Sequence, residues 1–231
     1  MIEIHSKLPA QGVTIFSIMT AMAHRLNALN LSQGFPDFDA PPALLQALSQ
    51  ATLDGFNQYA AGDGLLALRE QLAQLFLKRD QLQLDPITEI TITPGATIGI
   101  FSAIQAIIHQ DDEVIIFDPS YDSYAPSVQL VGGKAIHIPL NAPEFSVDWN
   151  QVKSAITDKT RMVIVNTPHN PTGAIWSKQD WLNLIELIQD KNIIVLSDEV
   201  YEHLIFDGEK HYSALSFPAL RERSFVVGSF G

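Results

Sequence analysis

From residue 89 onward, short apolar runs alternate with segments of helical spacing, and this alternation constrains the fold more than any other feature. Continuous apolar runs are typical of strands that are covered on both faces. The expected strands are 91–93, 114–117, 135–138, 162–165, 193–196 and 225–228. Between them, helices are expected at 97–109, 121–130, 149–156 and 178–189. Strands that alternate with helices in this way predict an α/β domain with a mostly parallel sheet.

The first third of the chain lacks such strands. Helical spacing is present within residues 12–30 and again in 65–79, and Pro41 and Pro42 suit the first turn of a third helix. A Gly/Pro/Asp-rich turn over 31–40 and a polar, Gly-rich loop over 57–64 separate these segments. This part therefore reads as helices joined by loops.

Composition excludes several classes of protein. Hydrophobic residues make up 46% of the 231 positions, which is enough for a substantial core, and the formal net charge is −12. A strongly acidic chain does not bind nucleic acid or an anionic membrane, because phosphate contacts need clustered Lys and Arg. Cysteine is absent, so disulfides and thiolate metal sites are excluded, and no metal is expected. Without a signal sequence or an apolar span of ~20 residues, a soluble cytoplasmic protein is expected.

Chemistry is expected where strands end, because open α/β sheets bind ligands beyond the carboxyl ends of their strands. Gly95, Ala96 and Thr97 form the first such turn and open a helix. Free backbone N–H groups and the helix dipole make a turn of this kind suitable for an anion. The alternative is a glycine kept for steric reasons, which the turn alone does not exclude.

Two further strand ends carry aromatic and amide side chains. Tyr121 follows Asp118-Pro119-Ser120 and could stack on a flat heterocycle or simply pack in the core. Asn166 and Asn170 lie in a sharply turning loop that runs to Gly173. Their neutral amides offer ligand contacts, and the alternative is the turn-forming role that asparagine commonly has.

Asp198 ends a run of apolar residues, so its carboxylate lies at the rim of a buried sheet and needs a partner. A pyridinium N–H⁺ is a suitable one, since a charge-assisted hydrogen bond keeps such a ring protonated. Tyr201 is three residues further on, and a bend would bring its hydroxyl to the same ligand. The alternative is a helix N-cap at Asp198 with Glu199 in the first turn.

The order and spacing of these segments resemble fold type I, pyridoxal 5′-phosphate (PLP)-dependent class I/II aminotransferases. The resemblance covers essentially the whole chain. It is carried by Asn170-Pro171-Thr172-Gly173, by Ser197-Asp198-Glu199-Val200-Tyr201 and by the terminal Ser229-Phe230-Gly231. Segments 30–38, 118–124 and 166–171 look most similar to the methionine and kynurenine aminotransferase branch. The resemblance implies a three-layer, aspartate aminotransferase-like fold. It also implies an N-terminal segment of a small domain over 1–40 and an incomplete large PLP-binding domain over 41–231.

The resemblance also implies roles for individual residues. Gly95, Ala96 and Thr97 would cradle the cofactor phosphate together with the Ser229 hydroxyl. Tyr121 would stack on the ring and Asp198 would pair with its nitrogen. Asn170 and Tyr201 would hydrogen-bond the phenolic oxygen of PLP, and Asn166 would line the same wall of the site. Tyr59 would reach the phosphate bound by the partner subunit. Gly34 and Asn170 would contact the substrate.

In the family, the Ser-x-Gly motif is followed by the lysine that binds PLP covalently. We therefore expect the Schiff-base lysine directly after Gly231, which is the last residue of this sequence. The arginine that binds the substrate carboxylate is also expected beyond that point. Asp198 and Tyr201 are then the catalytic candidates within the chain.

The implied activity is transfer of the amino group of an L-amino acid, methionine or an aromatic one preferred, to a 2-oxo acid by a homodimer. Two alternatives stay open. The same fold and cofactor support a β-lyase that acts on cysteine conjugates or cystine. A third reading, from a different class, is a non-catalytic PLP-fold sensing module.

Overall fold

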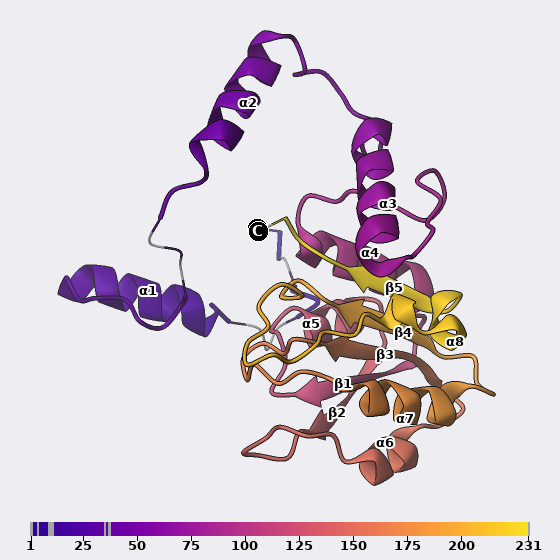
Figure 1. The fold of residues 1–231 in the computed structure, drawn as a ribbon. Helices are drawn as coiled ribbons and strands as arrows, with labels where there is room; N and C mark the ends of the chain where they lie inside the picture. Colours follow the sequence, from indigo (N-terminus) through magenta and orange to yellow (C-terminus); the bar gives the residue numbers. More distant parts are fainter. Residues whose placement is uncertain (1, 4, 9–11, 35, 37, 231) are drawn as a thin grey trace.

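The structure, a computed structural model, describes residues 2–3, 5–8, 12–34, 36 and 38–230. Its sheet and the helices on the two faces form three layers, with α1, α2 and α3 outside them (Figure 1). The sheet contains β1 (Glu113–Asp118), β2 (Lys134–Pro139), β3 (Thr160–Asn166), β4 (Ile194–Asp198) and β5 (Ser224–Val227). All of its strand pairs are parallel, and the order is β2-β1-β3-β4-β5. The predicted α/β fold with a mostly parallel sheet is confirmed.

Side chains alternate between two buried clusters, one on each face of the sheet. Val114 and Ile116 of β1 pack against α4 (Ala96–Ile107) and α5 (Tyr124–Leu130). Ile115 and Phe117 belong to the opposite cluster, with α6 (Trp149–Ala155), α7 (Lys178–Ile188) and α8 (Pro218–Arg221). Because successive residues of a strand face opposite sides, a strand covered on both faces must be apolar throughout.

α7 begins with a capping box. The Ser177 hydroxyl accepts a hydrogen bond from the Asp180 N–H, and the Asp180 carboxylate accepts one from the Ser177 N–H at 2.8 Å. A buried ladder of aromatic rings follows from this placement. The Trp181 ring lies edge-on to Trp176 at 4.9 Å, and the Trp181 indole N–H donates to the Tyr212 carbonyl at 2.9 Å. The cap and the ring contacts together fix α7 against the sheet.

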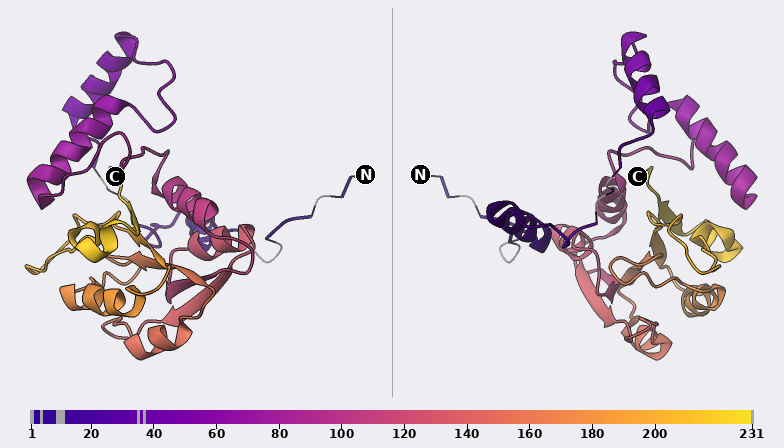
Figure 2. Two further views of the ribbon diagram at one scale, coloured as in Figure 1. Left: turned by 90° about the vertical axis from the view of Figure 1, so that its right-hand side faces the viewer. Right: turned by 60° about the vertical axis from the view of Figure 1, so that its left-hand side comes forward.

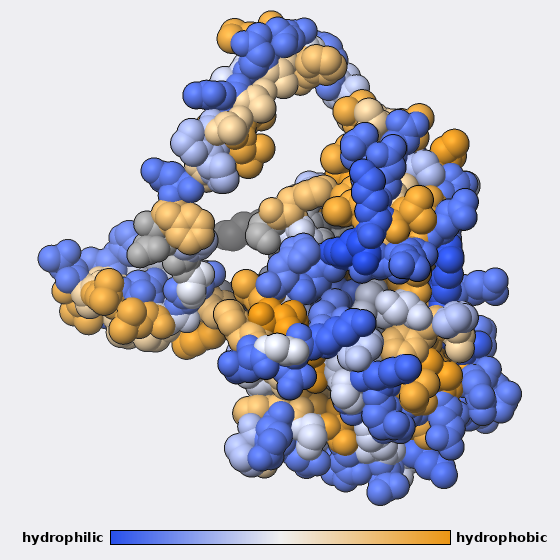
Figure 3. All heavy atoms as spheres, viewed as in Figure 1, coloured by the Kyte–Doolittle hydropathy of each residue, from blue (hydrophilic) through white to orange (hydrophobic). Residues whose placement is uncertain are grey.

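The N-terminal helices are differently packed. α1 (Ile15–Leu26), α2 (Pro42–Leu53) and α3 (Leu66–Asp80) were all predicted, and α2 and α3 stand outside the three layers in both views of Figure 2. No residue of α1 or α2, all of which the structure describes, is buried. Apolar side chains are instead visible on their surfaces (Figure 3). Within the described part of the chain, every helix falls short of the length and apolar character needed to cross a membrane.

Two sequence expectations are corrected, and one segment contains elements that were not expected. Residues 91–93 are not a strand, because Ile92 N–H donates to the Asp63 carbonyl and not to a strand of the sheet. The helix expected over 121–130 begins only at Tyr124, so Tyr121 lies in the preceding turn. The segment between β4 and β5 contains a 3-10 helix, η1 (Ala214–Ser216), and α8, neither of which was predicted.

Candidate active site

The candidate site is a cavity of about 260 Å³ at the carboxyl ends of the strands. The order of the strands explains its position. β2 lies on one side of β1, whereas β3, β4 and β5 extend the sheet on the other side. Such a reversal of strand order opens a crevice at the ends of the neighbouring strands. The residues that line the cavity are Ala96, Thr97, Ile100, Tyr121, Tyr124, Asn166, Asn170, Asp198, Val200, Tyr201 and Ser229.

The N-terminus of α4 forms one wall. Gly95 is its N-cap residue, with φ 90°, a left-handed conformation that suits glycine. No side chain caps this end, and Ala96 and Thr97 of the first turn line the cavity. The first backbone N–H groups of a helix have no partner within the helix. Together with the helix dipole they favour a phosphate or carboxylate at this wall.

Asp198, at the end of β4, is the acidic group of the cavity and is 4% exposed. Tyr124 O–H donates to its Oδ2 at 2.5 Å, and Val200 N–H donates to Oδ1 at 3.3 Å. Burial raises the pKa of Asp198, and the two hydrogen bonds oppose that rise by favouring the ionised carboxylate. The alternative role of helix N-cap is wrong, since residues 199–203 form turns and no helix.

Asn166 ties two strand ends together. Its Nδ2 donates to the Asp198 carbonyl at 3.0 Å, and its Oδ1 accepts from the Asn170 N–H at 2.7 Å. Thr167 N–H also donates to the Asp198 carbonyl, at 3.1 Å. Asn166 is 7% exposed, so its amide lines the cavity and at the same time fixes the loop that carries Asn170.

The aromatic wall consists of Tyr121 and Tyr124, whose ring centroids lie 5.6 Å apart in an edge-to-face arrangement. The Tyr121 hydroxyl is 3.4 Å from the Thr97 hydroxyl, which links this wall to the N-terminus of α4. Tyr201 and Ser229 line the cavity as well, and Tyr201 is 37% exposed. These side chains offer a flat ligand an aromatic ring to pack on and polar groups to contact at its edge.

Glu199 is a second buried carboxylate next to Asp198, and it belongs to the opposite side of the sheet. It is 2% exposed and accepts hydrogen bonds from Ser197 Oγ at 2.7 Å and from Ala214 N–H at 3.0 Å. His211 Nε2 is 3.0 Å from its other oxygen. Glu199 therefore fixes the return of the chain towards β5, a role that the sequence did not reveal.

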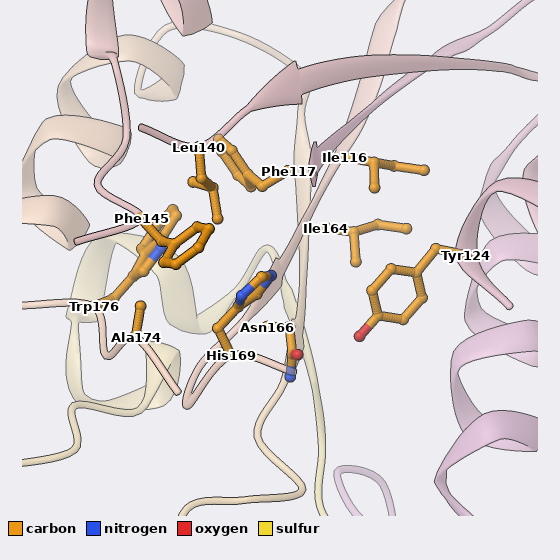
Figure 4. A pocket seen from close by; sticks show the side chains of 10 residues that line it. All are labelled: Ile116, Phe117, Tyr124, Leu140, Phe145, Ile164, Asn166, His169, Ala174 and Trp176. Carbon is orange, nitrogen blue, oxygen red and sulfur yellow. The ribbon is translucent and has the colours of Figure 1, made fainter. Parts of the chain in front are cut away.

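A smaller cavity of about 10 Å³ shares Tyr124 and Asn166 with the candidate site, and Figure 4 shows the side chains that line it. His169 also lines it, is 7% exposed, and places Nδ1 2.7 Å from the Thr172 hydroxyl. Burial lowers the pKa of His169, and a hydrogen bond with the Pro119 backbone works in the opposite direction. His169 thus connects the loop after β3 with the loop after β1.

Two predicted residues lie elsewhere. Tyr59 is fully exposed in the loop between α2 and α3, and Gly34 is exposed in the turn before α2. Neither lines the cavity. Phe35, next to Gly34, lies outside the described residues. The structure therefore brings the predicted strand-end residues together and leaves these two apart from them.

The donor set fits a phosphorylated heterocycle with a protonated ring nitrogen. A buried carboxylate whose two hydrogen bonds favour its ionised form matches a ring N–H⁺. An uncapped helix N-terminus matches a phosphate, and a tyrosine face matches a planar ring. Tyr124 is the residue of this set that sequence reasoning missed. No sequence signal distinguishes it from Tyr121, which lies three residues earlier.

Comparison with known proteins agrees with this chemistry. The chain matches the family "Aminotransferase class I and II" over residues 27–231. It is 47% identical to the methionine aminotransferase of Escherichia coli, over 98% of this chain and 58% of that protein. It is 36% identical to kynurenine–oxoglutarate transaminase 1 of Mus musculus, over 92% of this chain and 53% of that protein.

Solved structures show the same likeness. The crystal structure of an Escherichia coli protein identified as a methionine aminotransferase superimposes with a TM-score of 0.95 at 46% identity. It covers all of this chain, 100%, and 60% of that one. The N-succinyldiaminopimelate aminotransferase of Mycobacterium tuberculosis gives a TM-score of 0.93 at 38% identity, over 98% of this chain and 60% of that one. The chain spans somewhat more than half the length of these relatives.

Proposed function

We propose that this chain, which belongs to the class I and II aminotransferases, provides the PLP site of a transaminase. The reaction transfers the amino group of an L-amino acid to a 2-oxo acid. The observation that carries the proposal is the convergence of residues from five separate segments on one cavity. They are Ala96, Thr97, Tyr121, Asn166, Asn170, Asp198, Tyr201 and Ser229.

Each residue then has a defined task. The backbone N–H groups at Ala96 and Thr97, with the Ser229 hydroxyl, bind the phosphate. The Tyr121 ring packs on the cofactor ring, and Asn170 and Tyr201 orient its phenolic oxygen. Asp198 accepts the hydrogen bond of the ring N–H and keeps that proton in place. PLP, when bound, supplies the electron sink that amino-acid chemistry at the α-carbon requires.

We assign proton movement at the substrate α-carbon to the lysine that binds PLP in this family. We place that lysine in the part of the relatives' length that this chain does not cover. The same applies to the arginine that binds the substrate carboxylate. Within this chain the proposal therefore concerns cofactor binding and the protonation of its ring. Gly34 and Asn170 are proposed to face the substrate.

Methionine or an aromatic amino acid is the proposed donor. Support comes from the relatives, one described as a methionine aminotransferase and another as a kynurenine transaminase. Comparing kcat/KM for methionine, phenylalanine and aspartate measures the choice between donors directly.

A β-lyase and a non-catalytic sensing module are the competing functions. Methionine with a 2-oxo acid yields the methionine-derived oxo acid only if amino transfer occurs. Cystine yields pyruvate and ammonia only if a leaving group departs from the β-carbon. A sensing module binds PLP and forms neither set of products, so product analysis separates the three functions.

We propose further that the active form is a cytoplasmic homodimer. Residues 1–40 would contribute to a small domain and 41–231 to the large domain. Tyr59 is fully exposed within its own chain, which suits a residue that binds the phosphate of the partner subunit. In a mixed dimer of a Tyr59→Phe subunit and a subunit that lacks the Schiff-base lysine, one site has an intact lysine and also receives an intact Tyr59 from its partner. Full PLP affinity should be restored at that site. Unchanged affinity at that site would place Tyr59 in its own subunit.

The central experiment compares Asp198→Asn with Asp190→Asn in the full-length protein. Asp190 is exposed at the end of α7 and serves as the matched control. We expect Asp198→Asn to lower single-turnover transamination by several orders of magnitude, about 1.4 kcal/mol for each factor of ten, because asparagine does not hold a full proton on the ring nitrogen. Wild-type rates in Asp198→Asn, or no PLP-dependent absorbance in the wild type, would reject the proposed function.

A further inference from the structure

We propose that Tyr124 is a positioning residue that keeps the Asp198 carboxylate ionised and turned towards the cavity. The inference rests on the proposed function only for the identity of the ligand that Asp198 meets. Its basis is one contact between the first residue of α5 and the last residue of β4. These two residues are distant in the sequence and adjacent in the fold.

The contact is buried on both sides. Tyr124 is 2% exposed and Asp198 is 4% exposed, so bulk water does not compete for the hydrogen bond. The Tyr124 ring is fixed by the cluster that contains Ile100 and Val128, and its edge contacts the Tyr121 ring. A tyrosine O–H held in this way has one proton to donate, and it donates it to Asp198 Oδ2 at 2.5 Å.

The direction of this hydrogen bond matters for charge. An O–H that donates to a carboxylate favours the ionised form, whereas burial favours the protonated form. The pKa of Asp198 is raised by burial and further by the neighbouring Glu199 charge, and the Tyr124 hydrogen bond is the larger of the two bonds that lower it. Burial also raises the pKa of Tyr124, so its hydroxyl remains a donor.

The other groups around the pair do not replace Tyr124. Tyr121 and Tyr201 interact electrostatically with Tyr124, and His211 pairs with Glu199 on the opposite side of the sheet. The second donor to Asp198 is the Val200 N–H, at the longer distance of 3.3 Å to Oδ1. Tyr124 thus engages Oδ2 and leaves Oδ1, with its weaker bond, to face a ligand N–H⁺.

Loss of the tyrosine hydroxyl has a defined chemical consequence. A protonated Asp198 is neutral, so it no longer offers the negative charge that stabilises a ring N–H⁺ through a charge-assisted hydrogen bond. A Tyr124→Phe protein should therefore hold a neutral Asp198 over a wider pH range than the wild type. The ring itself remains, so packing against α4 and Tyr121 is kept.

The first test needs no cofactor. The ¹³C carboxyl resonance of Asp198, assigned by its disappearance in Asp198→Asn, is titrated in the ligand-free protein before and after Tyr124→Phe. We expect a higher titration midpoint in Tyr124→Phe. An unchanged or lower midpoint overturns the inference, whatever the protein binds. A circular dichroism melt of Tyr124→Phe verifies that the measured protein is folded.

The second test is a double-mutant cycle on PLP affinity. Tyr124→Phe in the wild-type background should weaken binding about tenfold, with a loss that grows as the pH falls, as expected for one charge-assisted hydrogen bond. In the Asp198→Asn background the same change should have no further effect, because no carboxylate remains to be held. Equal losses in both backgrounds would mean that Tyr124 acts by packing alone and would reject the inference. A wild-type protein that binds no PLP would reject the proposed function instead, and the carboxyl titration would still decide the role of Tyr124.

Discussion

The sheet region and the N-terminal helices of this chain use similar amounts of apolar sequence in different ways. In the region from α4 to β5, Val114, Met162 and Val195 are 0% exposed, because helices cover both faces of the sheet. In α2, Leu48 is 65% exposed and Leu53 is 81% exposed. The difference shows that amphipathic spacing specifies a helix without specifying what covers it.

Arg69 is the exception among the N-terminal helices. It is the one buried residue of α3, all of which the structure describes, and it is 5% exposed. Its guanidinium donates to the carbonyls of Gly64, Pro86 and Ile87 and pairs with Asp63 at 2.9 Å. Polar contacts with the backbone, and not a core, hold this part of the chain in shape.

The largest effect should come from the centre of the sheet region. Trp181→Ala removes a fully buried ring and an indole hydrogen bond, and we expect a loss of ~3–5 kcal/mol in the free energy of unfolding. Leu48→Ala in α2 should cost less than ~0.5 kcal/mol. Urea denaturation of both proteins measures the contrast. A loss of several kcal/mol in Leu48→Ala would show that α2 is covered in the assembled protein. The contrast between the sheet region and the N-terminal helices would then not hold.

A smaller effect is expected from Arg69→Met, which sharpens the comparison. The change leaves three partly buried carbonyls without a donor and should cost ~1–3 kcal/mol of local stability. Hydrogen exchange at the Ile92 N–H, which donates to Asp63 at 3.0 Å, should become faster while exchange in β3 stays unchanged. Arg25→Met in exposed α1 is the matched control and should alter neither.

Helix caps give a contrast of about 1 kcal/mol. Ser177→Ala removes the cap of α7, which is packed on the sheet, and should lower stability by ~1 kcal/mol. Thr14→Ala removes the equivalent cap of α1, where the Thr14 hydroxyl accepts from Ser17 N–H, and the unfolding of the sheet should not respond. Equal losses would mean that α1 unfolds together with the sheet.

The smallest expected effect is a gain in Tm, and it comes from the candidate site within the sheet region. The pKa of Asp198 is raised by burial in the folded protein, so the stability associated with its protonated form is present at low pH and is lost as the pH rises through the folded-state pKa. Asp198→Asn should therefore raise the Tm of the ligand-free protein at neutral pH, and the gain should vanish at acidic pH. A Tm below that of the wild type at neutral pH would contradict this sign.

The sheet was predictable because its strands are continuous apolar runs. The strand expected at 91–93 was wrong because three alternating residues do not distinguish a strand from an extended loop. The position of Asp198 was predictable, since parallel strands bring their carboxyl ends to one edge. Its partner Tyr124 was not. The sequence does not show where the first turn of α5 lies relative to β4, and that placement decides which of two nearby tyrosines reaches the carboxylate.

Glu199 illustrates the same limit. One alternative placed it in the first turn of a helix capped by Asp198, but the structure buries it among Ser197, His211 and Ala214. His211 and Ala214 come from the segment between β4 and β5, whose path depends on the packing of η1 and α8 on the sheet. Local sequence signals do not include such long-range contacts.

The cavity is lined from Ala96 to Ser229, so its walls are brought together only after every crossover of the sheet has been completed. Contacts of this sequence separation form late and slowly in folding. A ligand that spans them binds the finished sheet and not its precursors, and it stabilises that state by RT ln(1 + [L]/Kd). The yield of folded protein in a cell would then depend on how much of that ligand is present while the chain is being made.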